Sequence, residues 1–184
     1  MKYNVIRSNR KSLALVVKPD GTLLVRSPRL VPGDKIAAFV EQHRDWIGKK
    51  QLELAERQKI RSEVPKLTAK ELKELKDKAM NEFPERVRYF AGILRVSYGR
   101  ISIRNQKTKW GSCSSKGNLS FNCLLMLAPE FVRNYVVVHE LCHRKEMNHS
   151  LRFWAEVEAV LPDYKEAKRW LHLYGEALMS RNPC

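Results

Sequence analysis

The chain is poor in cysteine, has no long apolar run, and lacks acidic residues over one long stretch. Its four cysteines lie far apart, at positions 113, 123, 142 and 184, so no C-x-x-C pair indicates a disulfide framework or a cysteine-rich zinc site. This spacing favours free thiols in a reducing cytoplasm. The N-terminal apolar run, residues 13–17, is too short for a signal-peptide core or a membrane span. We therefore expect a cytoplasmic protein with no membrane partner.

The charge of the chain is strongly positive and unevenly distributed. Its 184 residues carry a formal net charge of +15, and no Asp or Glu occurs between Arg86 and Pro129. Eight basic residues fall in this stretch, at positions 86, 88, 95, 100, 104, 107, 109 and 116. Such a stretch either attracts an anionic partner, here a nucleotide or a nucleic acid bound through residues 86–116, or forms a solvated face without a ligand.

The N-terminal part, residues 1–62, is expected to form a β-hairpin followed by a helix. Apolar residues alternate within 13–17 and 23–25, and the intervening Pro19-Asp20-Gly21 is typical of a tight turn. From Asp34 to Ile47 apolar residues recur every three or four positions, which predicts an amphipathic helix.

Residues 63–184 complete what we expect to be a single domain spanning 1–184. Thr68 and Glu71 form a capping box that predicts a helix start, and Pro84 is expected to interrupt that helix. Alternation with a period of two predicts two or three short antiparallel strands within 96–121. Further helices are expected over 129–143, 151–161 and 164–179. The fold class is therefore α+β, with a small antiparallel sheet packed on a long apolar helix.

One segment of that apolar helix contains candidate metal-binding and catalytic residues. It is His139-Glu140-Leu141-Cys142-His143. Residues four apart on a helix lie about one turn apart on the same face, so His139 and His143 can bind one metal ion. This is the H-E-x-x-H pattern of zinc hydrolases, in which the glutamate, here Glu140, serves as general base. The alternative is a buried helix whose two histidines serve packing and hydrogen bonding.

A third ligand is needed for an open tetrahedral site, and His149 is the expected one. It follows His143 by six residues, as in the metzincin pattern, but Glu146 stands where that pattern requires glycine. A metzincin assignment is therefore excluded. Asn148 is expected to supply the left-handed turn that returns His149 to the metal. Glu156 and Glu158 are the competing ligands.

Several motifs together resemble the YgjP-like metallopeptidase family. They are Trp110-Gly111-Ser112-Cys113-Ser114, residues 119–122, the run from Tyr135 to His143, Asn148-His149-Ser150 and Phe153-Trp154. The resemblance is close over about residues 85–175. It implies a zincin-like fold, metal-dependent hydrolysis, His139, His143 and His149 as metal ligands, and Glu140 as catalytic acid/base.

We therefore expect a zinc-dependent hydrolase of metallopeptidase type, acting on a peptide or protein with Zn²⁺ as cofactor. Contacts to substrate or anion are expected from Arg104, Lys107, Lys109, Asn122 and Arg152, and an extended substrate is expected to pair with the strand at 118–122. Candidates for stabilising the oxyanion are Arg152, Tyr164 and His172. Two alternatives stay open: a metal-dependent nucleotide phosphohydrolase, and a nucleic-acid-associated binding protein with a non-catalytic metal site.

Overall fold

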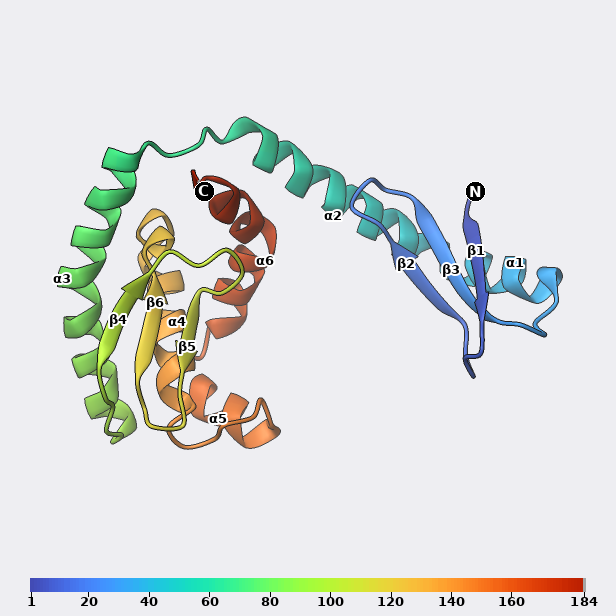
Figure 1. Ribbon diagram of the computed structural model, residues 1–184. Helices are drawn as coiled ribbons and strands as arrows, with labels where there is room; N and C mark the ends of the chain where they lie inside the picture. The colour runs from blue at the N-terminus through green and yellow to red at the C-terminus, as the bar shows by residue number, and fades with distance from the viewer. Residues whose placement is uncertain (184) are drawn as a thin grey trace. The chain divides into compact units, whose positions relative to one another are not determined.

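The computed structural model describes residues 1–183, so the expectation of a free thiol at Cys184 lies outside the described residues. The chain forms two compact units, Met1–Glu63 and Val64–Cys184, which we describe separately (Figure 1). That the chain works as one metallopeptidase-type domain stays a prediction. Among the described residues, no helix combines the length and apolarity that a membrane span requires. Cys113, Cys123 and Cys142 are free thiols.

The first unit is a three-stranded sheet with two helices. Strands β1 (Asn4–Ser8), β2 (Ala14–Val17) and β3 (Leu23–Pro28) lie in the order β1-β3-β2. The expected hairpin is β2 with β3, joined by a turn in which Gly21 has a φ of 80°. β1 pairs with β3 in parallel. Helices α1 (Gly33–Gln42) and α2 (Arg44–Glu63) follow, with a break at His43 where one helix was expected.

A small apolar core holds this first unit together. Leu23 and Val25 of β3 are buried with Ile36 and Val40 of α1 and with Ile47 of α2. Trp46 of α2 is 47% exposed and lies outside this core.

The second unit begins with a long helix, α3 (Ala69–Leu94), and the Thr68–Glu71 capping box predicted for its start is confirmed. The helix continues through Pro84, so the expected interruption is wrong. Proline removes one helical N–H and its hydrogen bond. Burial of Phe83 and Val87 on either side of Pro84 stabilises the continuous helix instead.

A mixed sheet lies against this helix. It contains β4 (Ile101–Arg104), β5 (Gly111–Cys113) and β6 (Leu119–Asn122) in the order β4-β6-β5. β4 pairs with β6 in parallel and β5 pairs with β6 antiparallel, so the expectation of an all-antiparallel sheet is wrong. The chain runs from β4 back along β5 before it enters β6, and β6 therefore points the same way as β4. The expected strand at 96–98 is irregular.

Four helical segments complete the second unit. They are η1, a 3₁₀ helix (Cys123–Leu127), α4 (Glu130–Cys142), α5 (Leu151–Val160) and α6 (Tyr164–Ser180). Figure 1 shows α4 behind the sheet, with α3 along one side and α6 along the other. Phe121 of β6 stacks on Phe83 of α3 at a ring distance of 4.8 Å, which joins sheet and helix in one core.

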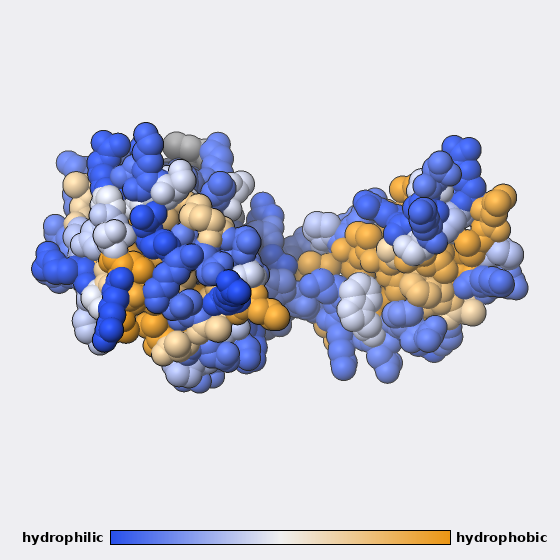
Figure 2. Space-filling model, turned by 90° about the horizontal axis from the view of Figure 1, so that it is seen from below, coloured by the Kyte–Doolittle hydropathy of each residue, from blue (hydrophilic) through white to orange (hydrophobic). Residues whose placement is uncertain are grey.

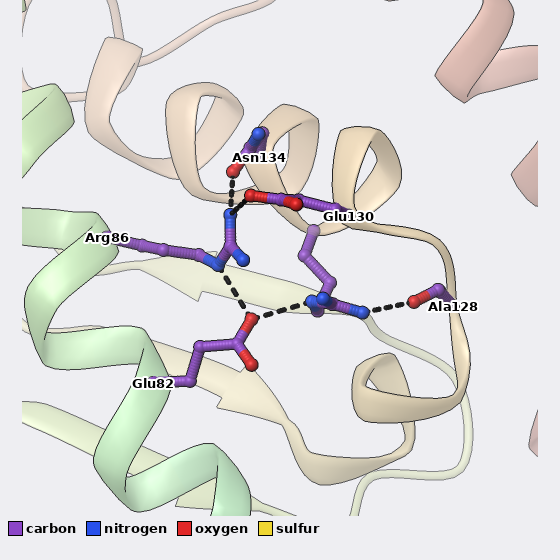
Figure 3. A network of polar contacts seen from close by, with 6 residues as sticks. Glu82, Arg86, Ala128, Glu130 and Asn134 are labelled. Atoms are coloured by element: carbon purple, nitrogen blue, oxygen red, sulfur yellow. Dashed lines mark hydrogen bonds and ion pairs between the residues drawn. The ribbon is translucent and has the colours of Figure 1, made fainter.

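The contact between α3 and α4 also contains a polar network (Figure 3). Glu82 accepts from Arg86 Nε and Arg133 Nε, each at 2.7 Å. Arg86 also donates to Glu130, at 3.1 Å, and to Asn134. Arg133 also donates to the Ala128 carbonyl. Arg86, the first cation of the basic stretch, is thus neutralised inside the fold.

Candidate active site

Three histidines converge at the end of α4. His139 lies in its last turn, His143 caps its C-terminus, and His149 lies in the loop before α5. Their ligand atoms all lie within 4.8 Å of one another, and the Nε2 atoms of His139 and His149 are 3.0 Å apart. Zinc held by imidazoles at about 2.0–2.1 Å in a tetrahedron separates two ligand nitrogens by about 3.3 Å. The cluster therefore fits a zinc-sized cation.

The protonation of His139 and His143 also fits a metal site, because a metal binds only neutral imidazole. Burial lowers the pKa of His139 to about 3, with smaller contributions from the charges of His143, His149 and Lys168. Burial also lowers the pKa of His143. Nδ1 of His143 lies 3.1 Å from the Glu146 carbonyl, which can only accept, so Nδ1 donates and Nε2 is left for a ligand.

Aromatic packing holds the three rings in place. The ring of the fully buried Phe153 lies 4.9 Å from that of His139, 4.7 Å from that of His143 and 4.8 Å from that of His149. The ring of Trp154 stacks on that of His149 at 5.8 Å. These contacts fix the ring positions through packing of α5 under the end of α4.

The loop that carries His149 is shaped by side-chain hydrogen bonds. Asn148 accepts from the Ser150 N–H at 3.2 Å, and Ser150 caps α5 by accepting from the Phe153 N–H. The expected left-handed conformation of Asn148 is wrong, since Arg95 is the one non-glycine residue with positive φ in the described chain. An Asx-type turn therefore replaces the strained residue.

Glu140 is buried beside the histidine cluster, with 6% of its surface exposed. It lines a cavity of about 230 Å³ together with His139, Tyr135, Lys109 and Gly111. Burial raises the pKa of Glu140 to about 7, and the nearby charge of Lys109 opposes part of that shift. A carboxyl with this pKa can accept and return a proton near neutral pH.

The residues expected to contact substrate differ in where they lie. Lys109 lines the cavity. Asn122 is fully buried, and its side-chain amide donates to the carbonyls of Gln106 and Lys109, so it positions the loop before β5. Arg104, Lys107 and Arg152 have exposed side chains and lie outside the residues that line the cavity. The candidates for stabilising the oxyanion, Arg152, Tyr164 and His172, also lie outside that set.

Three further residues build the site and were not predicted from the sequence. Gly111 leaves the space that the Glu140 carboxylate occupies. The hydroxyl of Tyr135 lies 3.5 Å from Nδ1 of His139, and Phe153 supports all three imidazoles. The interval of four between Tyr135 and His139 was a readable signal, because such residues share a helix face. The contact of Gly111 with Glu140 joins distant segments and leaves no local signal.

Comparison with known proteins identifies the family. The YgjP-like metallopeptidase domain matches residues 11–73 and 61–174, which together cover most of the chain. The match supports a peptide or protein substrate and gives no support to nucleotide or nucleic-acid partners. No curated protein matches.

Two solved structures show similarity over about half of the chain. One is the metallopeptidase zymogen abylysin of Pyrococcus abyssi, with 27% identity, coverage of 48% of this chain and 91% of that one, and a TM-score of 0.45. The other is the metallopeptidase zymogen jannalysin of Methanocaldococcus jannaschii, with 23% identity, coverage of 49% and 93%, and a TM-score of 0.44. The family match, which spans both units, shows that the chain belongs to the YgjP-like metallopeptidase family of metal-dependent hydrolases.

Proposed function

We propose that this protein is a zinc metallopeptidase in which His139, His143 and His149 hold the metal and Glu140 is the general base. The observation that carries the proposal is the convergence of three imidazoles beside one buried carboxylate in a cavity. Three neutral nitrogen ligands favour zinc and leave a position for water or substrate. The family match supports a peptide as the substrate class.

The chemistry divides between the metal and the chain. Bound zinc would supply a water of lowered pKa and would polarise the carbonyl group of the peptide bond to be cleaved. Glu140 takes a proton from the attacking water and delivers it to the leaving amine, for which its pKa of about 7 is suited. His143, held through Nδ1 by the Glu146 carbonyl, keeps the orientation that ligation requires.

The substrate backbone has one open strand edge available beside Glu140. β6 is the central strand, so the expected pairing of substrate with residues 118–122 is wrong. β5 is an edge strand of the sheet. The backbone groups of Trp110 and Ser114 form hydrogen bonds with the segment that contains β6. Because successive residues of an antiparallel strand direct their backbone groups to opposite sides, those of Gly111 and Cys113 point away from β6. A peptide that added to this edge would pair with β5 at Gly111, whose Cα faces the Glu140 side chain.

Glu140→Gln tests the proposal, because it removes the base and leaves all three ligands. We expect the variant to retain about one zinc per chain by metal analysis and to lose about 10²–10⁴-fold in peptide hydrolysis. Glu85→Gln, an exposed change on α3, is the matched control and should cleave like the wild type. Unchanged turnover in Glu140→Gln would exclude Glu140 as the base. Wild-type hydrolysis of nucleoside triphosphates in place of peptides would exclude the peptidase.

A further inference from the structure

A second cavity, of about 370 Å³, lies between α4 and the start of α6. Its apolar lining comes from Phe131, Leu161, Pro162 and Ala167, together with the rings of Tyr135 and Tyr164. Its acidic lining comes from Asp163 and Glu166. The volume falls in the lower part of the range for ligand pockets, which runs from about 300 to 1,000 Å³.

This cavity adjoins the metal site. Phe131, Tyr135 and His139 follow one another at intervals of four on α4, so they share one helix face with a rise of about 6 Å at each step. Tyr135 lines both cavities. A substrate in extended conformation places side chains on the same side about 6–7 Å apart. A residue close to the cleaved bond can therefore reach the second cavity.

The two carboxylates of this cavity are available to a ligand. Within residues 1–183, neither Asp163 nor Glu166 has a side-chain hydrogen bond or ion pair, although the chain carries a net charge of +15. The neighbouring Lys165 Nζ lies 3.5 Å from Glu158 instead. Acidic residues in the first turn of a helix also stabilise its dipole. That effect explains acids at the start of α6 but not the apolar cavity beside them.

We propose that this cavity binds a lysine or arginine side chain of the substrate, next to the bond that is cleaved. The inference rests on the proposed peptidase function. The methylene groups would pack on Phe131, Leu161 and Tyr164, while the cationic end would lie at Asp163 and Glu166. An uncharged side chain of the same length would keep the apolar contacts and lose the ion pairs, so the cavity distinguishes basic from apolar residues by charge.

Binding without turnover gives the direct test. Full-length Glu140→Gln protein, loaded with zinc, is titrated with two fluorescent peptides. They differ at one position, which is lysine in one peptide and norleucine in the other. We expect the lysine peptide to bind about tenfold more tightly, a difference that falls as salt rises. Adding Asp163→Asn and Glu166→Gln should abolish the preference and leave norleucine binding unchanged. Adding Glu85→Gln, an exposed acid on α3 outside the cavity, should leave the preference intact.

The outcomes separate this inference from the peptidase proposal. Equal or undetectable binding of the two peptides, or a preference that survives the double substitution, would overturn the basic-residue pocket. In wild-type protein, kcat/KM should show the same preference. Selective binding of the lysine peptide without cleavage by wild-type protein would support the pocket and reject the peptidase function. Cleavage of both peptides at equal rates would support the peptidase function and reject the basic-residue pocket.

Discussion

The backbone of Gly111 lies directly against the side chain of Glu140 at the centre of the site. A β-carbon added to Gly111 would lie 2.6 Å from Oε1 of Glu140 and 2.7 Å from its Cγ. Such separations are shorter than van der Waals contact, so any side chain at 111 must displace the carboxylate. The glycine therefore allows the edge strand β5 and the side chain of Glu140 to lie against each other.

Gly111→Ala is expected to lower kcat/KM for peptide hydrolysis by about 10²-fold, because a displacement of about 1 Å is enough for such a loss. Zinc content should stay near one per chain, since no ligand changes. Gly92→Ala on α3 is the control, because its added β-carbon meets no atom within 4 Å. Full activity in Gly111→Ala would show that the carboxylate position is not critical.

Glu140 should destabilise the metal-free protein as pH rises. The pKa of Glu140 is about 7 in the folded protein, against an ordinary value of 4.5. Below pH 4.5 the carboxyl is protonated in both states and costs nothing. Between 4.5 and 7 the unfolded chain ionises first, so the folded state loses about 3 kcal/mol in total.

Glu140→Gln removes the pH dependence of stability that the Glu140 carboxyl causes. In the presence of a chelator, urea unfolding should show the variant more stable than wild type at pH 8 and equal to it near pH 4.5. A stability difference independent of pH would contradict the shifted pKa of Glu140.

His149, rather than Glu156 or Glu158, should be the third zinc ligand. Both glutamates are engaged by lysines: Glu156 lies 2.7 Å from Lys145 and Glu158 lies 3.5 Å from Lys165. His149→Ala is expected to lose most of its zinc on dialysis against a weak chelator, while Glu156→Ala and Glu158→Ala retain about one ion per chain. Zinc loss from either glutamate variant with retention in His149→Ala would reverse the assignment.

Glu82 should stabilise the second unit through the network of Figure 3. Glu82→Gln leaves two largely buried guanidinium groups, those of Arg86 and Arg133, without their shared carboxylate. We expect the free energy of unfolding to fall by about 2–4 kcal/mol. Glu85→Gln, an exposed change one turn away, should alter it by less than about 0.5 kcal/mol. Equal effects of the two substitutions would show that the network does not stabilise the fold.

The environment of the site on its α5 side is partly apolar. Met147 and Leu151 flank His149 in the sequence, with 56% and 89% of their surfaces exposed. Figure 2 looks at the second unit from the side of α5 and shows apolar side chains among hydrophilic ones there.

The sequence by itself determined the parts of this protein that depend on neighbours along the chain. Helix periodicity placed His139 and His143 one turn apart, the Thr68–Glu71 capping box marked the start of α3, and the combined motifs indicated the family. The helical and capping features depend on spacings of three or four residues, which local geometry fixes.

Only the tertiary structure decided what distant segments build together. The three-residue strand β5 has no alternating apolar pattern, yet its insertion makes β4 and β6 parallel and leaves β5 at the edge. The same packing places Gly111 against Glu140 and brings the start of α6 beside Tyr135. Such contacts depend on how sheet and helices fill one core, and no local spacing in the sequence encodes that arrangement.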